Sequence, residues 1–299
     1  MAKLWELIWS WLRSFFAPQP LAGLRVGFLS TVGQDDAKFF LLQFEKGLGR
    51  SVDATRYAKG QYGRGSHKLR DLARELMEGA DKVNVIAATG GRTALEAVVD
   101  AANLKPAVQI PIVFLGDKEI ADPNISGGLV LDMPSYNQDR VTELNNRYKA
   151  AKVGLLVNLN AASGPDERKN WDKSWGPVQP VGETEDNDKI NFQEAINLLV
   201  GAGASGIVVA GDSFFTSKAP SLVALLNNAD KPVCYPFQSY KGAGPGAKKG
   251  KSMRYGVDLN IQYVTLGQLA KRVLEDLAKK PDTIPKVGVH QIPNTIEHW

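Results

Sequence analysis

The chain has 299 residues, and 36 Lys and Arg against 32 Asp and Glu leave a formal net charge of +4. A hydrophobic fraction of 43% is ordinary for a folded protein and excludes disorder, collagen and coiled coil. The single cysteine excludes a disulfide framework, and the three histidines lack metal-ligand spacing, so we expect no metal and no cofactor. The charge surplus is too dilute to indicate a nucleic acid partner.

Residues 1–16 differ sharply in composition from the rest of the chain. At 100° per residue, the polar side chains share one arc and the large apolar side chains take the remaining face. This pattern predicts an amphipathic helix that attaches the protein to a membrane surface or to a membrane-protein partner. A signal peptide or signal anchor and a helix packed on its own core are the alternatives. The contact residues we expect are Trp5, Ile8, Trp9, Leu12, Phe15 and Phe16.

The body then alternates apolar strands with amphipathic helices. Strands are predicted at 24–30, 51–57, 83–89 and 111–116, with helices that start near Asp35, His67 and Arg92. The same order returns in the second half, with strands at 152–160, 178–183, 206–212 and 231–237 and helices at 191–200 and 221–227. This order predicts an α/β protein with two Rossmann-like lobes, each with a parallel sheet. A single (β/α)₈ barrel has a suitable length, but the irregular stretch 161–188 fits it less well.

Ligands of open parallel sheets bind beyond the carboxyl ends of the strands. This rule selects small and polar residues that follow the predicted strands. In the first lobe they are Ser30, Thr31, Thr89, Gly90, Gly91, Arg92, Thr93, Gly116 and Asp117. In the second lobe they are Asn158, Asp212, Ser213, Phe214 and Gln238.

The segment TGGRT (89–93) is the best of these candidates. A strand that runs directly into glycines and then a helix leaves backbone N–H groups and the helix dipole free to hold a carboxylate. Small residues are equally what a tight turn between strand and helix requires, so both interpretations stay open. Asp117 and Asp212 stand where a binding protein would place acceptors for an amine or a hydroxyl.

Two glycine-rich motifs look like nucleotide sites without the necessary context. GAGASG (201–206) follows a helix and precedes a strand, the reverse of a dinucleotide site, so we expect a helix end and a turn. GAKKGKS (246–252) has Pro245 where a P-loop needs glycine. The basic loop at 241–254 that contains this motif has five cations, which form either a solvated surface or a contact for an acidic partner or lipid headgroups. They are Lys241, Lys248, Lys249, Lys251 and Arg254. The sequence contains no catalytic triad or carboxylate pair, so we expect no enzyme.

Four segments in order resemble substrate-binding proteins of ABC transporters with the periplasmic binding protein type I fold, in the branch that binds tryptophan and other small ligands. They are VNVIAATGGRTALEAVV (83–99), IPIVFLGDKEIADPNISGGLV (110–130), GIVVAGDSFFTSKAPSLVALLNNADKPVCYPF (206–237) and YGVDLNIQYVTLGQLAKRVLEDLAKKPDTIPKV (255–287). The resemblance implies a non-catalytic protein that binds an amino acid or organic acid between its lobes. A scaffold or accessory subunit with a degenerate cleft is the alternative, and homo-oligomers are possible partners.

The resemblance also implies a hinge that the chain crosses three times, near 133–137, Asp258 and Lys286, which adds Tyr136 and Asn137 to the ligand candidates. The implied domains are 1–22, a first lobe of 23–134 plus 259–285, and a second lobe of 135–258 plus 286–299. The chain departs from the family in its N-terminal segment, in a loop after Asn160 that carries Trp171 and Trp175, and in a basic insertion at 241–254. The sequence leaves the side of the membrane and the identity of the ligand open.

Overall fold

A computed structural model describes residues 21, 23–58, 66–104, 109–131, 136–181, 191–244 and 246–299. The amphipathic helix predicted for residues 1–16 therefore lies outside the described residues, as does most of the hinge segment 133–137. Among the described residues, no helix is long and apolar enough to cross a lipid bilayer.

The first lobe is a six-stranded parallel sheet in the order β11-β5-β4-β3-β1-β2. Its strands β1, β3 and β4 are continuous buried apolar runs, as expected for parallel strands covered on both faces. The strands are β1 (Val26–Ser30), β2 (Ala54–Tyr57), β3 (Val85–Thr89), β4 (Ile112–Gly116), β5 (Ile125–Val130) and β11 (Gly288–Gln291). The helices are α2 (Gln34–Leu48), α3 (His67–Glu78), α4 (Arg92–Asn103) and α10 (Leu259–Lys279).

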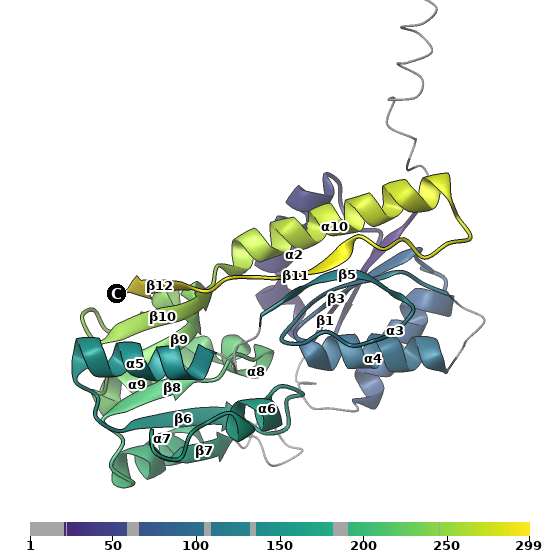
Figure 1. The fold of residues 1–299 in the computed structure, drawn as a ribbon. Coiled ribbons are helices and arrows are strands. Elements are labelled where there is room, and N and C mark those ends of the chain that lie inside the picture. Colours follow the sequence, from purple (N-terminus) through teal and green to yellow (C-terminus); the bar gives the residue numbers. More distant parts are fainter. Residues whose placement is uncertain are drawn as a thin grey trace, which may run out of the picture.

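The second lobe has a sheet in the order β12-β10-β9-β8-β6-β7, in which only the edge strand β12 is antiparallel. Its strands are β6 (Val153–Asn158), β7 (Val178–Val181), β8 (Gly206–Val209), β9 (Val233–Phe237), β10 (Ser252–Val257) and β12 (Thr295–His298). Its helices are α5 (Asn137–Tyr148), α6 (Gly164–Lys169), α7 (Phe192–Gly201), α8 (Ser213–Ser217), α9 (Ala219–Ala229) and the 3₁₀ helix η3 (Gln238–Gly242). The two separate sheets confirm the two-lobed α/β architecture and exclude the barrel (Figure 1).

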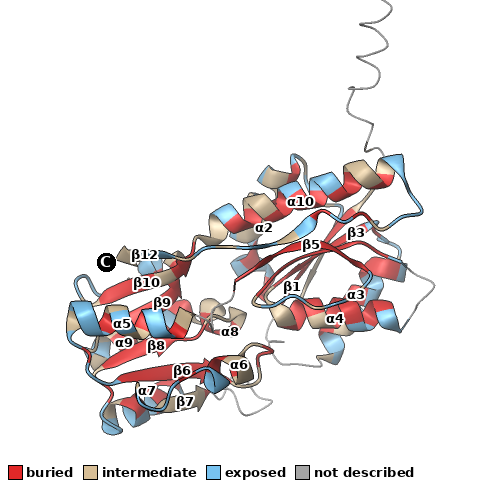
Figure 2. Cartoon of the chain, in the orientation of Figure 1, coloured by how far each residue is buried: buried red, intermediate tan, exposed pale blue. Residues whose placement is uncertain are grey.

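Both sheets are buried between helices whose outer faces are exposed (Figure 2). In the first lobe, α2 and α10 cross in backbone contact, because a Cβ at Gly47 would lie 1.9 Å from Val264 O and one at Gly267 would lie 2.0 Å from Phe44 O. This close crossing carries Phe40 of α2 onto Tyr263 of α10, with ring centroids 4.7 Å apart. The stacked side chains of Phe40 and Tyr263 face the space between the lobes.

Several expected boundaries need correction. The third crossing lies after Gln291 and not near Lys286, because 288–291 pairs with β5 in the first lobe and only β12 joins the second. The second crossing falls at Asp258, which caps α10 by accepting from Asn260 N. The stretch after Asn160 is not a loop throughout, since 164–169 form α6. Helix α2 starts at Gln34, next to the expected start near Asp35.

The two glycine motifs behave as predicted. Between the end of α7 and the start of β8, GAGASG forms a turn with Gly203 at φ 88°. GAKKGKS leads into β10 and not into a helix. The basic loop is not simply solvated, because Lys248 and Lys251 both pair with Asp230, and Lys241 and Arg254 both pair with Glu297.

Candidate functional site

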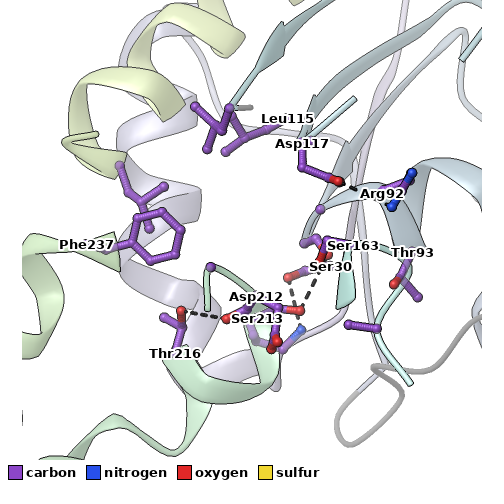
Figure 3. A pocket seen from close by; sticks show the side chains of 18 of the residues that line it. Ser30, Arg92, Thr93, Leu115, Asp117, Ser163, Asp212, Ser213, Thr216 and Phe237 are labelled. Atoms are coloured by element: carbon purple, nitrogen blue, oxygen red, sulfur yellow. Dashed lines mark hydrogen bonds and ion pairs between the residues drawn. The ribbon is translucent and has the colours of Figure 1, made fainter. Parts of the chain in front are cut away.

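A cavity of about 80 Å³ lies between the lobes, where the carboxyl ends of both sheets face each other (Figures 1 and 3). It is lined by Ser30, Val32, Phe40, Gly90, Gly91, Arg92, Thr93, Leu115, Gly116, Asp117, Leu131, Ala161, Ser163, Gly211, Asp212, Ser213, Thr216, Phe237, Leu259 and Tyr263. The lining comes from both lobes and from the amino end of α10 beside the second crossing. A molecule bound here would therefore touch both lobes at once.

The turn from β3 to α4 forms one wall of the cavity. Gly90 and Gly91 have φ values of 114° and 81°, which side-chain-bearing residues rarely adopt. A Cβ at Gly90 would also lie 2.1 Å from Thr31 Oγ1. The glycines thus serve turn geometry and close approach, and they place the amino end of α4 at the cavity.

Arg92, the first residue of α4, bonds directly to the opposite lobe. Its Nη1 donates to Asp166 Oδ2 of α6 at 2.8 Å, and its Nη2 donates to the carbonyl of Ala162. Beside it, Ala162 N donates to Thr93 Oγ1 at 3.3 Å. The guanidinium also lies 3.4 Å from Asp117 Oδ2 of its own lobe. Arg92 therefore acts as a latch between the lobes.

A second set of hydrogen bonds joins the lobes deeper in the molecule. Thr31 Oγ1 donates to Ser213 Oγ at 2.8 Å, and Ser213 Oγ donates to Gly90 O at 3.4 Å. Thr31 comes from the loop after β1, and Ser213 is the first residue of α8. The lobes are thus held at two separate points around the cavity.

Asp117 follows β4 and reaches the cavity from the first lobe. Burial raises the pKa of its carboxyl to about 6, although the nearby Arg92 opposes this shift. Its Oδ1 has no hydrogen-bond partner within the described part of the chain. A buried acceptor without a donor is costly, so this oxygen is suited to a donor supplied by a ligand.

Asp212 reaches the cavity from the second lobe. Its Oδ1 caps α8 by accepting from Phe214 N at 2.8 Å and Phe215 N at 3.1 Å. Its Oδ2 is buried and has no partner among the described residues. Full burial raises the pKa of this carboxyl to about 7, against the lowering effects of the two backbone N–H groups and of the nearby Asn158 side chain.

A buried ion pair lies behind Asp212. Arg140 of α5 donates to Asn137 Oδ1 at 2.9 Å and to Val209 O at 3.2 Å, and its Nη1 lies 3.8 Å from Glu167 Oε2. Both charged side chains are almost completely buried. Since Glu167 stands next to Asp166 in α6, the pair of Glu167 and Arg140 fixes α6 to the second lobe close to the contact between Asp166 and Arg92.

The remaining wall of the cavity is apolar. It consists of Val32, Phe40, Leu115, Leu131, Phe237, Leu259 and Tyr263. Figure 3 shows Phe237 across the cavity from Arg92. A separate polar groove of about 710 Å³ shares Asp117 with the cavity. It is also lined by Lys118, Glu119, Asp166 and Lys169.

The structure brings nine of the sixteen predicted ligand residues into the cavity lining. They are Ser30, Gly90, Gly91, Arg92, Thr93, Gly116, Asp117, Asp212 and Ser213. The seven that do not line it are Thr31, Thr89, Tyr136, Asn137, Asn158, Phe214 and Gln238.

Most of these seven have structural roles nearby. Thr89 donates to Leu29 O, Asn137 accepts from Arg140, and Asn158 accepts from Asn160 N. Phe214 is fully buried against Phe192 and Phe215. The aromatic side chains of Phe40, Phe237 and Tyr263 were not predicted. Phe40 and Tyr263 reach the cavity only through the long-range packing of α2 and α10, whereas Phe237 is the last residue of β9, next to the predicted Gln238.

Comparison with known proteins places the fold but no closer relationship. No protein-family model and no curated protein matches the sequence. Among solved structures, the chain is similar to an ABC domain in complex with L-Trp from Streptococcus pneumonia, at 13% identity, with 91% of each chain covered and a TM-score of 0.68. It is also similar to an ABC transporter solute-binding protein from Bacillus halodurans C-125 with bound myo-inositol, at 12% identity over 91% of this chain and 93% of the other, with a TM-score of 0.62.

A LacI family transcriptional regulator from Enterococcus faecalis V583 with bound ribose shares the same architecture. It is 12% identical over 91% of this chain and 97% of the other, with a TM-score of 0.59. These similar structures are binding and regulator proteins. With its two sheets and a cavity between them, the chain has the two-lobed fold of the periplasmic binding proteins of type I.

Proposed function

We propose that the protein binds a small molecule between its two lobes and performs no chemistry on it, with amino acids, organic acids and the related amines as the candidate ligands. One observation carries this proposal: the two carboxyl side chains that line the cavity, Asp117 and Asp212, each have one buried oxygen, Oδ1 and Oδ2 respectively, with no hydrogen-bond partner among the described residues. A ligand with N–H or O–H donors would satisfy both. The fold supports the same function, because similar structures hold L-Trp, myo-inositol or ribose.

Gly116 offers a direct test of the cavity. A Cβ at this position would make ordinary contacts of 3.5 Å with Phe114 Cδ2 and 3.6 Å with Arg92 N, so Gly116→Ala fits, whereas the larger side chain of Gly116→Leu must extend into the cavity. Gly90 is a poorer choice, since a side chain there would push Thr31 aside.

The measurement is a calorimetric screen of amino acids, organic acids and amines against the full chain in mild detergent, with native mass spectrometry of gently purified protein to find retained molecules. We expect at least one ligand to bind to the wild type and to Gly116→Ala, and binding to fall by more than a hundredfold in Gly116→Leu. Equal binding by the leucine variant would place the ligand elsewhere and contradict the proposal.

An accessory or scaffold role is a second candidate, and the direct bonds between the lobes favour it. Arg92 with Asp166 and Thr31 with Ser213 would hold the lobes together in a protein that serves only as a rigid platform. Retention of a protein subunit in native mass spectrometry, with no small molecule bound in the screen, would support this role over ligand binding.

We also propose that residues 1–16 attach the protein to a membrane surface. The support lies in the sequence, where large apolar side chains, three of them tryptophan, share one face of the expected helix.

A further inference from the structure

The acceptors in the cavity come from both lobes. Asp117 reaches it from the end of β4, and Asp212 reaches it from the loop between β8 and α8. Each carboxyl has one oxygen already engaged, by Arg92 in the first case and by the α8 backbone in the second, and one buried oxygen without a donor. A bound group must therefore supply at least two donors.

The charges around the cavity do not balance. Among the described residues, three charged side chains line it, the carboxyls of Asp117 and Asp212 and the guanidinium of Arg92. One negative charge therefore remains in the lining when all three groups are ionised. A neutral polyol could satisfy the free oxygens but would leave this charge buried, whereas an ammonium group supplies both donors and charge.

A ligand carboxylate finds no free cation in the same cavity. Arg92 is the only cationic side chain among the described residues that line it, and Asp117, Asp166 and the Ala162 carbonyl already engage its two Nη atoms. Its buried Nε has no hydrogen-bond partner among the described residues but lies 4.0 Å from Glu96 Oε1, so a ligand carboxylate bound there would stand beside another carboxylate. The amino end of α4 lies next to the residue before Asp117, because a Cβ at Gly116 would lie 3.6 Å from Arg92 N. A carboxylate at this helix end would face like charge at short range.

The apolar wall indicates what the rest of the ligand is. Leu115, Leu131 and Phe237 line the side of the cavity away from the carboxyls, together with the stacked pair of Phe40 and Tyr263. Such a surface suits a hydrocarbon or aromatic body.

We propose that the cavity selects a small primary amine with an apolar body and no carboxylate of its own, whose ammonium group is bound by the free oxygens of Asp117 and Asp212. This selectivity rests on the proposed function, because it names the ligand class of the same cavity. It predicts that a decarboxylated amine binds better than the amino acid from which it derives.

Binding of an amine should also release protons from the carboxyls that line the cavity. Other groups that face Asp212 are Glu167 of α6, Asn158 of β6 and Tyr240 of η3, and those that face Asp117 are Arg92 of α4 and Asp166 and Glu167 of α6. An ammonium beside Asp212 would hold it ionised and lower its pKa from about 7, so binding near pH 6.5 releases a proton. A ligand carboxylate would favour the protonated acid instead, and its binding would take a proton up.

The test compares matched pairs by calorimetry on the full chain at pH 7.5: tryptamine with tryptophan, tyramine with tyrosine, and 3-methylbutylamine with leucine. We expect at least one amine to bind tenfold or more tightly than its amino acid. Asp117→Asn and Asp212→Asn should each weaken that amine tenfold or more. The matched control is Glu119→Gln, which removes a nearby negative charge outside the cavity lining and should change the affinity less than threefold.

Repeating the titration at pH 6.5 in phosphate and in bis-Tris, a tertiary amine that buffers at this pH, counts the protons exchanged. Release by the wild type and much less by Asp212→Asn is the expected result, because Asp117, with a pKa of about 6, is already mostly ionised at this pH. Tighter binding of every amino acid than of its amine, or proton uptake on binding, would overturn the amine selectivity and leave the proposed function standing. If no amine or amino acid binds and no organic acid in the wider screen does, the proposed function fails as well.

Discussion

At the scale of single residues, Asp212 combines two tasks that oppose each other. Its Oδ1 stabilises the start of α8, and its Oδ2 stays buried and unpaired at the cavity. The first task needs only an acceptor, which an asparagine also provides, whereas the charge is needed only by a ligand. The aspartate is therefore expected to lower stability for the sake of binding.

This conflict predicts a pH-dependent stability change in Asp212→Asn. The pKa of Asp212 is about 7 in the folded protein against 3.8 as its ordinary value, so the folded state holds its proton more tightly than the unfolded state. Wild-type stability from this group is therefore greatest below pH 4 and falls as the pH rises to about 7. The variant lacks this loss, and we expect it to gain about 2–4 kcal/mol over the wild type at pH 8 and little at pH 4.

Urea unfolding of both proteins at pH 4, 6 and 8 checks this prediction. Asp100→Asn, which removes an exposed carboxylate from α4, is the control and should show no such trend. A constant difference between Asp212→Asn and the wild type at all three pH values would mean that Asp212 is ionised throughout.

At the scale of elements, α4 and α6 meet across the cavity. Arg92 begins α4, and Asp166 lies in the first turns of the six-residue helix α6, which the buried pair of Glu167 and Arg140 fixes to its own lobe. The side chain of Arg92 is only 10% exposed and that of Asp166 is 40% exposed, so the ion pair is partly shielded from water. Opening the lobes must break it.

We therefore expect Asp166→Asn to shift the protein toward an open arrangement of the lobes. A partly shielded ion pair contributes about 1 kcal/mol, which corresponds to about a fivefold change in the ratio of open to closed molecules. Small-angle X-ray scattering should give a larger radius of gyration for this variant. Glu96→Gln is the matched control, since Glu96 lies 4.0 Å from the same guanidinium but within α4. An equal change in both variants would mean that Arg92 does not hold the lobes together through Asp166.

The sequence predicted some of the strands and helices and missed others. Buried strands such as β3 and β8 were predictable, because parallel strands covered on both faces are continuous apolar runs. Strands β5, β10, β11 and β12 were missed. In β5 (ISGGLV) and β10 (SMRYGV) glycine and polar residues interrupt the apolar run, and the edge strands β11 and β12 are mostly exposed or half-buried. Helix α6 was missed because GPDERK is short and has no apolar face.

The residues of the candidate site were likewise predicted in part and missed in part. Residues of the loops after strands, such as Asp117 and Asp212, were predicted because the carboxyl ends of parallel strands gather at one edge. Phe40 and Tyr263 were not, because they meet only where α2 and α10 cross at Gly47 and Gly267. Glycines within two amphipathic helices were the available signal for that crossing, but their partner could not be read from local sequence.

At the scale of the whole molecule, the sequence pairs a two-lobed body with an apolar N-terminal segment. Three of the six tryptophans of the chain lie within the first eleven residues. A set of apolar side chains of this size on one helix face is too large to stay in contact with water, so a membrane surface should cover it. Only Lys3 and Arg13 oppose Glu6 among the charged residues of this segment, so the attraction to anionic lipid is weak.

Binding to lipid vesicles should therefore depend on apolar contacts and little on salt. We expect the full chain to float with vesicles in a sucrose gradient equally at 0.1 and 1 M NaCl, since salt at these concentrations screens only electrostatic attraction. Replacing both Trp9 and Leu12 with glutamate should leave most of the protein at the bottom of the gradient. The melting temperature should stay nearly the same, because Pro18 and Pro20 separate the segment from the folded body in the sequence. If the double variant instead melts well below the wild type, and the wild type stays monomeric in water without lipid or detergent, the segment packs on the protein itself and the membrane attachment is wrong.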